Sequence, residues 1–137
     1  TLLLKDNSSH FLILGIPNEK DICNEITLNI KNKKRVTNLV GKTTINETIE
    51  ILSKCSYLIS ADSGIMHIAS AVNLTTFSIF GPTAISLGAP YWNNGKTISS
   101  LPPCAPCYPD KLLGCKDPVC MQNVTVDMVY NSIKVME

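Results

Sequence analysis

Short apolar runs alternate with stretches of helical periodicity along much of the chain. Residues 11–14 (Phe-Leu-Ile-Leu) form a continuous apolar run, which is typical of a parallel strand buried on both faces. The stretch 19–30 has an apolar residue at every fourth position, at Ile22, Ile26 and Ile30. That spacing predicts a helix with one apolar face against a sheet. The beginning of the chain therefore predicts a strand followed by a helix.

The same alternation continues through the middle of the chain. Residues 36–40 resemble a second strand, and Thr44 with Glu47 fits the capping box that starts a helix. This helix is expected to run to about Lys54, and its buried face would consist of Ile45, Ile49 and Leu52. A strand at 57–60, a short apolar helix at 65–72 and a strand at 76–80 complete the pattern. Alternating strands and helices predict an α/β fold with a parallel sheet.

The periodicity fails between residues 84 and 123, where most of the prolines lie. We expect a structured loop region there, with one strand near Thr97 and Ile98 and a cysteine-rich loop at 101–123. Thr125 can cap a last helix that carries apolar residues on one side. A length of 137 residues suits one domain, which we place over 1–137.

Charge and composition exclude several classes of protein. Lysine and arginine number 12 and aspartate and glutamate 11, so the chain lacks the basic surface of a nucleic-acid-binding protein. No apolar run approaches the ~18 residues of a transmembrane helix. Residues 2–4 are too short an apolar stretch for a secretory signal. The simplest expectation is a cytoplasmic protein, with peripheral association at the inner membrane left open.

Turns that follow three predicted strands, at 15–19, 62–67 and 81–83, should lie at one edge of the sheet, where parallel α/β sheets bind ligands. Asp62, Ser63 and Gly64 lead directly into a helix whose free N–H groups favour an anion such as phosphate. Alternatively, Asp62 or Ser63 only caps the helix. His67 faces either a ligand or the core, and a lone histidine of this kind is more typical of the core.

Four of the six cysteines gather near the carboxyl end, at positions 104, 107, 115 and 120. The Cys104-x2-Cys107 pair has the spacing of a metal-binding knuckle, whereas Cys115-x4-Cys120 is looser than a common zinc ribbon. Clustered thiols in a cytoplasmic protein bind a metal such as structural zinc or remain reduced, and both possibilities stay open.

Motifs of several common enzymes are missing. No His-x-Glu accompanies Pro103-Cys104-x-x-Cys107, as a zinc deaminase would need, and Ser63 lacks the flanking glycines of a hydrolase nucleophile. Gly41-Lys42-Thr43 matches only the end of a phosphate-binding P-loop. The sequence therefore predicts neither a deaminase, nor a serine hydrolase, nor an ordinary nucleotide hydrolase.

The stretch 60–71 (Ser-Ala-Asp-Ser-Gly-Ile-Met-His-Ile-Ala-Ser-Ala), followed by Phe80-Gly81-Pro82-Thr83, resembles glycosyltransferase family 9, the heptosyltransferases of lipopolysaccharide synthesis. The family pattern is Asp-Thr-Gly-x-x-His-x-Ala-x-Ala before a strand that ends in Gly-Pro-Thr, and Ser63 stands here for the usual threonine. The turn at 15–19, the segment 39–43 and the loop ending in Cys120-Met121 are similar to the family as well. The resemblance covers roughly residues 11–133.

The resemblance implies a Rossmann-like parallel sheet with flanking helices, the carboxyl-terminal, donor-binding half of a two-domain GT-B enzyme that uses ADP-heptose. It places Glu19, beside Gly15, near the ribose and Thr43 near the adenine. The residues expected around the diphosphate and heptose are Asp62, Ser63, Gly64 and His67.

The same resemblance implies an inverting glycosyltransferase that needs no metal for transfer. The base that activates the lipopolysaccharide core acceptor would lie in an amino-terminal domain, so no catalytic residue is expected in this chain. The first βα unit of the donor half would also be missing, with residues 1–5 as the end of its helix. A fragment that is inactive by itself is therefore expected. The alternative is a non-catalytic module whose cysteine-rich loop binds a metal or a protein.

Overall fold

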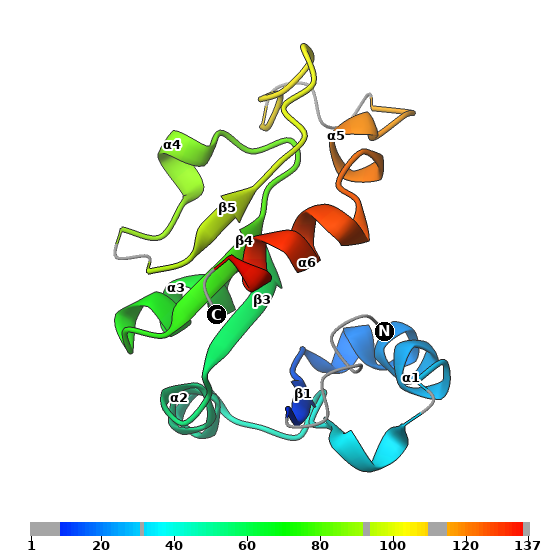
Figure 1. Cartoon of the computed structure of the whole chain (residues 1–137), viewed down its shortest axis with the longest axis vertical. Coiled ribbons are helices and arrows are strands. Elements are labelled where there is room, and N and C mark those ends of the chain that lie inside the picture. The colour runs from blue at the N-terminus through cyan, green and yellow to red at the C-terminus, as the bar shows by residue number, and fades with distance from the viewer. Residues whose placement is uncertain (1–8, 31, 92–93, 110–114, 136–137) are drawn as a thin grey trace. The chain divides into compact units, whose positions relative to one another are not determined.

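The computed structural model describes residues 9–30, 32–91, 94–109 and 115–135. The chain forms two compact units, Thr1–Thr48 and Ile49–Glu137, which are described separately below (Figure 1). The single domain expected over 1–137 stays a prediction. Residues 1–5, expected to end a helix, lie outside the described ranges.

The first unit is built on two parallel strands. β1 (Phe11–Ile13) pairs with β2 (Val36–Asn38), so that Phe11 lies opposite Val36. The connection between the strands contains η2 (Pro17–Glu19), α1 (Lys20–Leu28) and η3 (Lys33–Arg35). Helix α1 contacts β2, as the predicted strand–helix–strand order requires.

The prediction that the isoleucine face of α1 is buried is wrong. Ile22 is 61% exposed and Ile26 is 49% exposed, while Cys23 is buried. The Asn38 side chain on β2 donates to the Asn24 side chain at 3.1 Å and to the Thr27 hydroxyl at 3.4 Å. These polar contacts place the face of α1 that carries Asn24 and Thr27 against β2, in place of the isoleucine face. The spacing of apolar residues alone could not show this.

Helix α2 (Ile45–Ser53) starts with the predicted capping box. The Thr44 N–H donates to Glu47 Oε2 at 2.8 Å, and the Glu47 N–H donates to Thr44 Oγ1 at 3.3 Å. Of its predicted buried face only Leu52 is buried, whereas Ile45 and Ile49 are exposed.

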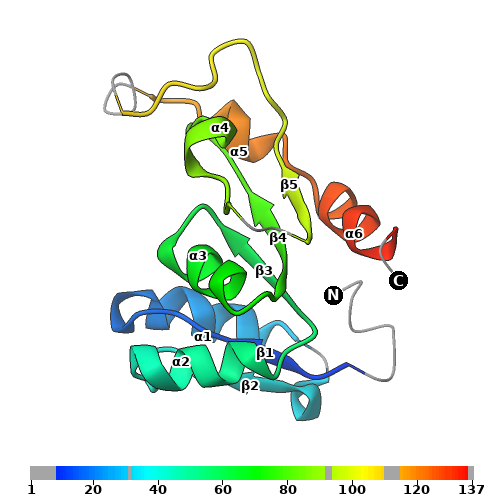
Figure 2. The ribbon, with the colours of Figure 1, turned by 90° about the vertical axis from the view of Figure 1, so that its left-hand side faces the viewer.

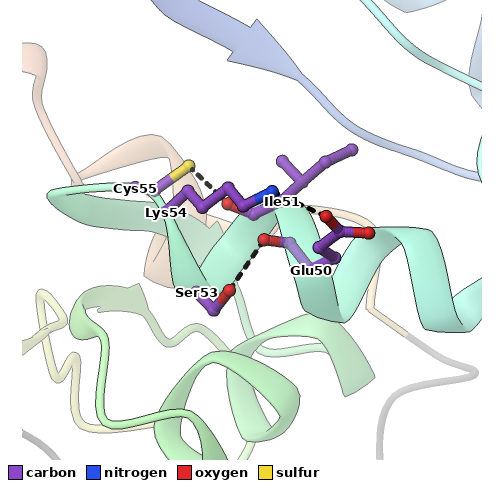
Figure 3. A network of polar contacts seen from close by, with 5 residues as sticks. All are labelled: Glu50, Ile51, Ser53, Lys54 and Cys55. Carbon is purple, nitrogen blue, oxygen red and sulfur yellow. Dashed lines mark hydrogen bonds and ion pairs between the residues drawn. The ribbon is translucent and has the colours of Figure 1, made fainter.

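Local contacts hold the carboxyl end of α2 (Figure 3). Lys54 Nζ lies 2.6 Å from Glu50 Oε1, and the Ser53 hydroxyl donates to the Glu50 carbonyl at 2.8 Å. The Cys55 thiol donates to the Ile51 carbonyl at 3.3 Å. Cys55 therefore follows the helix as a half-buried residue.

The second unit contains three parallel strands in the order β3 (Tyr57–Ala61), β4 (Thr75–Ile79) and β5 (Lys96–Ile98). Helix α3 (Gly64–Ala71) contacts β3 and β4, and α6 (Val126–Lys134) contacts β4 and β5. Figure 2 shows the two helices on opposite sides of β4. This is the layered arrangement expected of an α/β fold.

The core of this unit lies around β4. Its large buried side chains include Met66 of α3, Phe77 of β4, Phe80 directly after β4, Ile98 of β5 and Ile133 of α6. At Gly95, before β5, an added Cβ would collide with the Thr76 backbone, so only glycine allows the two segments to approach this closely.

Strand β3 has the composition of an internal strand but lies at an edge. Residues 57–59 are Tyr-Leu-Ile, yet within the described ranges β3 pairs only with β4. By contrast, β4 is paired on both sides and its three central residues are buried.

The irregular region after β4 contains the predicted strand, β5, and two short helices that the sequence did not predict. These are α4 (Ile85–Gly88) and α5 (Val119–Gln122). Each is a single turn, too short for a periodic signal. Part of the cysteine-rich loop, residues 110–114, lies outside the described ranges.

Candidate functional site

The turn after β3 places an exposed helix start at the carboxyl end of the sheet. The Asp62 N–H still bonds to the Ile79 carbonyl at 3.0 Å, so the turn continues directly from the β3–β4 ladder. Ser63 is the N-cap of α3 with extended backbone, and Gly64 is the first helical residue. The rigid sheet therefore fixes the position of the amino end of α3.

No side chain caps α3 within the part of the chain that the structure describes. The two other helices with predicted caps differ: Thr125 Oγ1 accepts from the Met128 N–H at 3.2 Å in α6, and Thr44 caps α2. Capping by Asp62 or Ser63, the alternative raised by the sequence, is therefore not observed. The Met66 N–H donates to the Ser63 carbonyl at 3.1 Å, so the N–H groups of Gly64 and Ile65 are the ones that α3 can offer to an anion.

The Ser63 hydroxyl points to another serine. Ser63 Oγ lies 3.0 Å from Ser60 Oγ, and the Ser60 hydroxyl donates to the Ala61 carbonyl at 2.8 Å. This chain of hydrogen bonds accounts for the absence of a serine cap on the helix. Ser60 was not among the sequence-predicted site residues, because a serine within a strand carries no motif.

Gly64 and His67 are both open to solvent. An added Cβ at Gly64 would meet no atom within 4 Å. His67 is exposed, so the expectation of a core histidine is wrong. Both residues can meet a ligand at the amino end of α3.

A second turn borders Asp62. An added Cβ at Gly88 would lie 3.6 Å from Asp62 Oδ1 and 3.4 Å from Thr83 Cγ2. The turn after β4 and helix α4 therefore lie beside the Asp62 carboxylate, as expected for turns at one edge of a parallel sheet.

The cysteine-rich loop holds this second turn. The N–H groups of Cys107 and Tyr108 both donate to the Pro82 carbonyl, at 2.8 and 3.1 Å. Met121 packs against Gly81, where an added Cβ would overlap its sulfur, and Cys120 is buried nearby. The loop thus fixes the Gly81–Thr83 turn through backbone contacts, which cysteine spacing does not reveal.

The four cysteines predicted as metal ligands differ in exposure: Cys104 and Cys115 are exposed, Cys107 is half-buried and Cys120 is buried. Within the described ranges, which include all four, no group of three or more His, Cys, Asp or Glu residues could hold a metal ion. The structure does not bring these thiols together as a metal site.

The first unit carries the other predicted residues on two interlocking turns. Gly41, with φ of +68°, donates its N–H to the Gly15 carbonyl at 2.9 Å. Glu19 Oε2 accepts from the Ile16 N–H at 2.9 Å, and Thr43 Oγ1 lies 3.0 Å from Thr48 Oγ1. Gly15 and Glu19 therefore follow the carboxyl end of β1, and Thr43 lies in the segment between β2 and α2, while their roles toward a ligand stay a prediction.

None of the described helices is both long and apolar enough to cross a membrane.

Comparison with known proteins gives a consistent family assignment. The sequence profile of glycosyltransferase family 9 (heptosyltransferase) matches residues 3–114. Lipooligosaccharide heptosyltransferase 2 of Campylobacter jejuni subsp. jejuni serotype O:6 is 35% identical over 130 residues, which are 93% of this chain and 41% of that protein. Lipopolysaccharide heptosyltransferase 2 of Escherichia coli K12 is 26% identical over 97 residues, 69% of this chain and 28% of that protein.

Solved structures show the same fold. The structure of E. coli ADP-heptose lps heptosyltransferase II matches with a TM-score of 0.78 at 17% identity, over 98% of this chain and 38% of that one. The glycosyl transferase family 9 structure from Veillonella parvula matches with a TM-score of 0.80 at 16% identity, over 93% of this chain and 36% of that one. The predicted Rossmann-like α/β fold of the GT-B type is confirmed. The chain spans about two fifths of the length of the Campylobacter relative and of the solved structures, and a smaller share of the E. coli K12 protein; it belongs to glycosyltransferase family 9.

Proposed function

We propose that this chain binds ADP-heptose and supplies the donor-binding part of an inverting heptosyltransferase for the inner core of lipopolysaccharide. One observation carries the proposal: the amino end of α3 is exposed at the carboxyl edge of the sheet with no side-chain cap. Family membership supports the same reaction class.

The free amino end of α3 suits the diphosphate of a sugar nucleotide. Aligned peptide dipoles place partial positive charge there, which stabilises an anion by about 0.3–1 kcal/mol at an exposed site. No acidic side chain lies in the first turn of α3 to compete, whereas α2 has Glu47 and α6 has Asp127 in that position. An anionic ligand would therefore prefer α3 to either of these helices.

The open side of Gly64 allows close approach of the diphosphate. The fold itself does not require a glycine at position 64, because an added Cβ would meet no neighbouring atom there. A glycine lets a ligand approach the backbone N–H groups more closely than a residue with a Cβ does. The position of Gly64 thus agrees with direct phosphate contact by the α3 backbone.

The same groups can assist glycosyl transfer. As the sugar–oxygen bond breaks, negative charge grows on the departing diphosphate, and fixed N–H donors stabilise that charge without rearranging. Asp62 would accept hydrogen bonds from hydroxyl groups of the heptose, and His67 would lie beside the heptose and diphosphate. Glu19 beside Gly15 would contact the ribose, and Thr43 the adenine. The acceptor base would come from outside this chain, no metal would be needed for transfer, and the reaction would occur in the cytoplasm at the inner membrane.

Calorimetric titration of the 137-residue chain tests the proposal. We expect ADP-heptose and ADP to bind and adenosine, which lacks the phosphates and their charged hydrogen bonds to the α3 backbone, to bind at least about tenfold more weakly. Asp62→Ala should weaken the binding of ADP-heptose. Asp127→Ala, which removes an exposed carboxylate from α6, should leave that binding unchanged. Failure of both nucleotides to bind, or equal binding by the Asp62→Ala variant, would refute the proposal.

A further inference from the structure

The hydrogen bonds of Ser60 determine the direction of the Ser63 hydroxyl. A serine hydroxyl has one hydrogen to donate and two lone pairs to accept with. Ser60 gives its hydrogen to the Ala61 carbonyl at 2.8 Å, because a carbonyl oxygen can only accept. The 3.0 Å contact between Ser60 and Ser63 must therefore use the hydrogen of Ser63.

Ser63 is left as a pure acceptor toward the ligand. Its hydrogen is engaged inside the protein, while its lone pairs face solvent at the exposed N-cap position. The diphosphate of a sugar nucleotide is fully ionised at neutral pH and carries no O–H to donate. Ser63 therefore cannot bind that diphosphate in this arrangement, but it can accept from a hydroxyl group.

We propose that Ser60 is a positioning residue that holds the Ser63 hydroxyl as an acceptor for a hydroxyl of the transferred sugar, while the α3 backbone binds the diphosphate. The inference rests on the proposed function and assigns different parts of the donor to neighbouring groups. The placement of Ser60 suits this role, because it is half-buried on β3 and paired with Ser78 of β4, which restrains its backbone.

The test compares two ligands that share the nucleotide and differ in the sugar. At pH 8, Ser60→Ala should lower the affinity for ADP-heptose about three- to tenfold, which is the effect of losing one neutral hydrogen bond. ADP should bind within about twofold of its original affinity, because the α3 N–H groups are unchanged. Ser60→Thr keeps a hydroxyl and suits a strand, so it should restore ADP-heptose binding to within about twofold.

Two controls separate positioning from folding. Ser53→Ala removes a hydroxyl that donates to a carbonyl over the same 2.8 Å at the end of α2 (Figure 3), and it should change neither affinity. A double-mutant cycle supplies the second control. Once Ser63→Ala has removed the acceptor, adding Ser60→Ala should weaken ADP-heptose no further.

Each outcome has one meaning. If Ser60→Ala lowers the affinities for ADP and ADP-heptose equally, Ser63 binds the nucleotide part and the inference is overturned. An unchanged affinity for ADP-heptose in Ser60→Ala would also overturn it, as would fully additive losses of affinity in the double variant. Binding of both nucleotides to the original chain would keep the proposed function in each of these cases. Failure of both to bind would instead overturn the proposed function and this inference with it.

Discussion

Gly64 differs in its surroundings from the other glycines that the structure describes in the second unit. A Cβ at Gly64 meets nothing, whereas one at Gly95 collides with the Thr76 backbone. We expect Gly64→Ala to leave stability unchanged or raise it by up to about 1 kcal/mol, since alanine favours the helix. The same substitution should weaken ADP about tenfold by blocking close approach. Chemical denaturation and calorimetry measure the two effects.

Gly95→Ala is the contrasting variant. It should cost about 3 kcal/mol or more, because the backbone of β4 cannot move aside for the added methyl group. A Gly64→Ala variant that unfolds like Gly95→Ala would contradict the assignment of Gly64 to the ligand.

Glu47 gives the stability a pH dependence. The Thr44 backbone N–H, and then its hydroxyl, donate to Glu47 and lower the pKa of that carboxyl. A folded pKa below the unfolded value, about 4.3, stabilises the chain above that pH, and the effect is lost as the pH falls through the folded pKa. Glu47→Gln should therefore melt at a lower temperature than the original chain at pH 7, and the difference should shrink as the pH falls below about 4.

Thermal melts from pH 7 to pH 3 provide the measurement. Glu25→Gln removes the same charge from an exposed position on α1 and serves as the control. A difference between Glu47→Gln and the original chain that stays constant across this range would show that the capping box does not depend on the carboxylate charge.

At the scale of elements, helix starts divide into capped and uncapped ones. Thr125→Ala should cost about 1 kcal/mol of stability, because it removes the acceptor for the Met128 N–H. Ser63→Ala should cost clearly less, since Ser63 also occupies an N-cap position but does not cap α3. Urea denaturation of the two variants compares them directly, and equal losses would mean that Ser63 caps its helix in solution.

Elements with strong local signals were predictable from the sequence. The helix expected at 65–72 is α3 (Gly64–Ala71), and the strand expected at 76–80 is β4 (Thr75–Ile79). Local patterns could not predict which face of α1 is buried, because Asn38 on another element turns that face.

The candidate site was predictable as a set of positions, and its hydrogen bonding was not. The order of strands and turns identified Asp62, Ser63 and Gly64, since turns after parallel strands share one edge. The choice between a capped and a free α3 depended on Ser60, whose role exists only in three dimensions.

At the scale of the whole molecule, the thiols report how the chain is packed. Alkylation followed by mass spectrometry should modify the exposed Cys104 and Cys115 first, and the buried Cys23 and Cys120 only after unfolding. Burial raises the pKa of Cys55, so less thiolate is present at a given pH and its reaction should be slow until the pH is raised.

Zinc provides a further comparison. One equivalent of zinc should leave the labelling of Cys104 and Cys115 unchanged, because the structure does not bring the cysteines together. Protection of both residues, lost in a Cys107→Ser variant, would instead support the metal site predicted from the sequence.

The position of β3 at the edge of the described three-stranded sheet affects how this protein will behave at high concentration. Within the described ranges the strand ladder pairs β3 on the β4 side alone, and a sheet edge of this kind is a template on which another extended chain can add. We expect concentrated samples to form aggregates, so that the average molar mass measured by light scattering rises with concentration. A charged residue on this strand, such as Leu58→Lys, should keep the molecules apart and make dilute and concentrated samples behave alike.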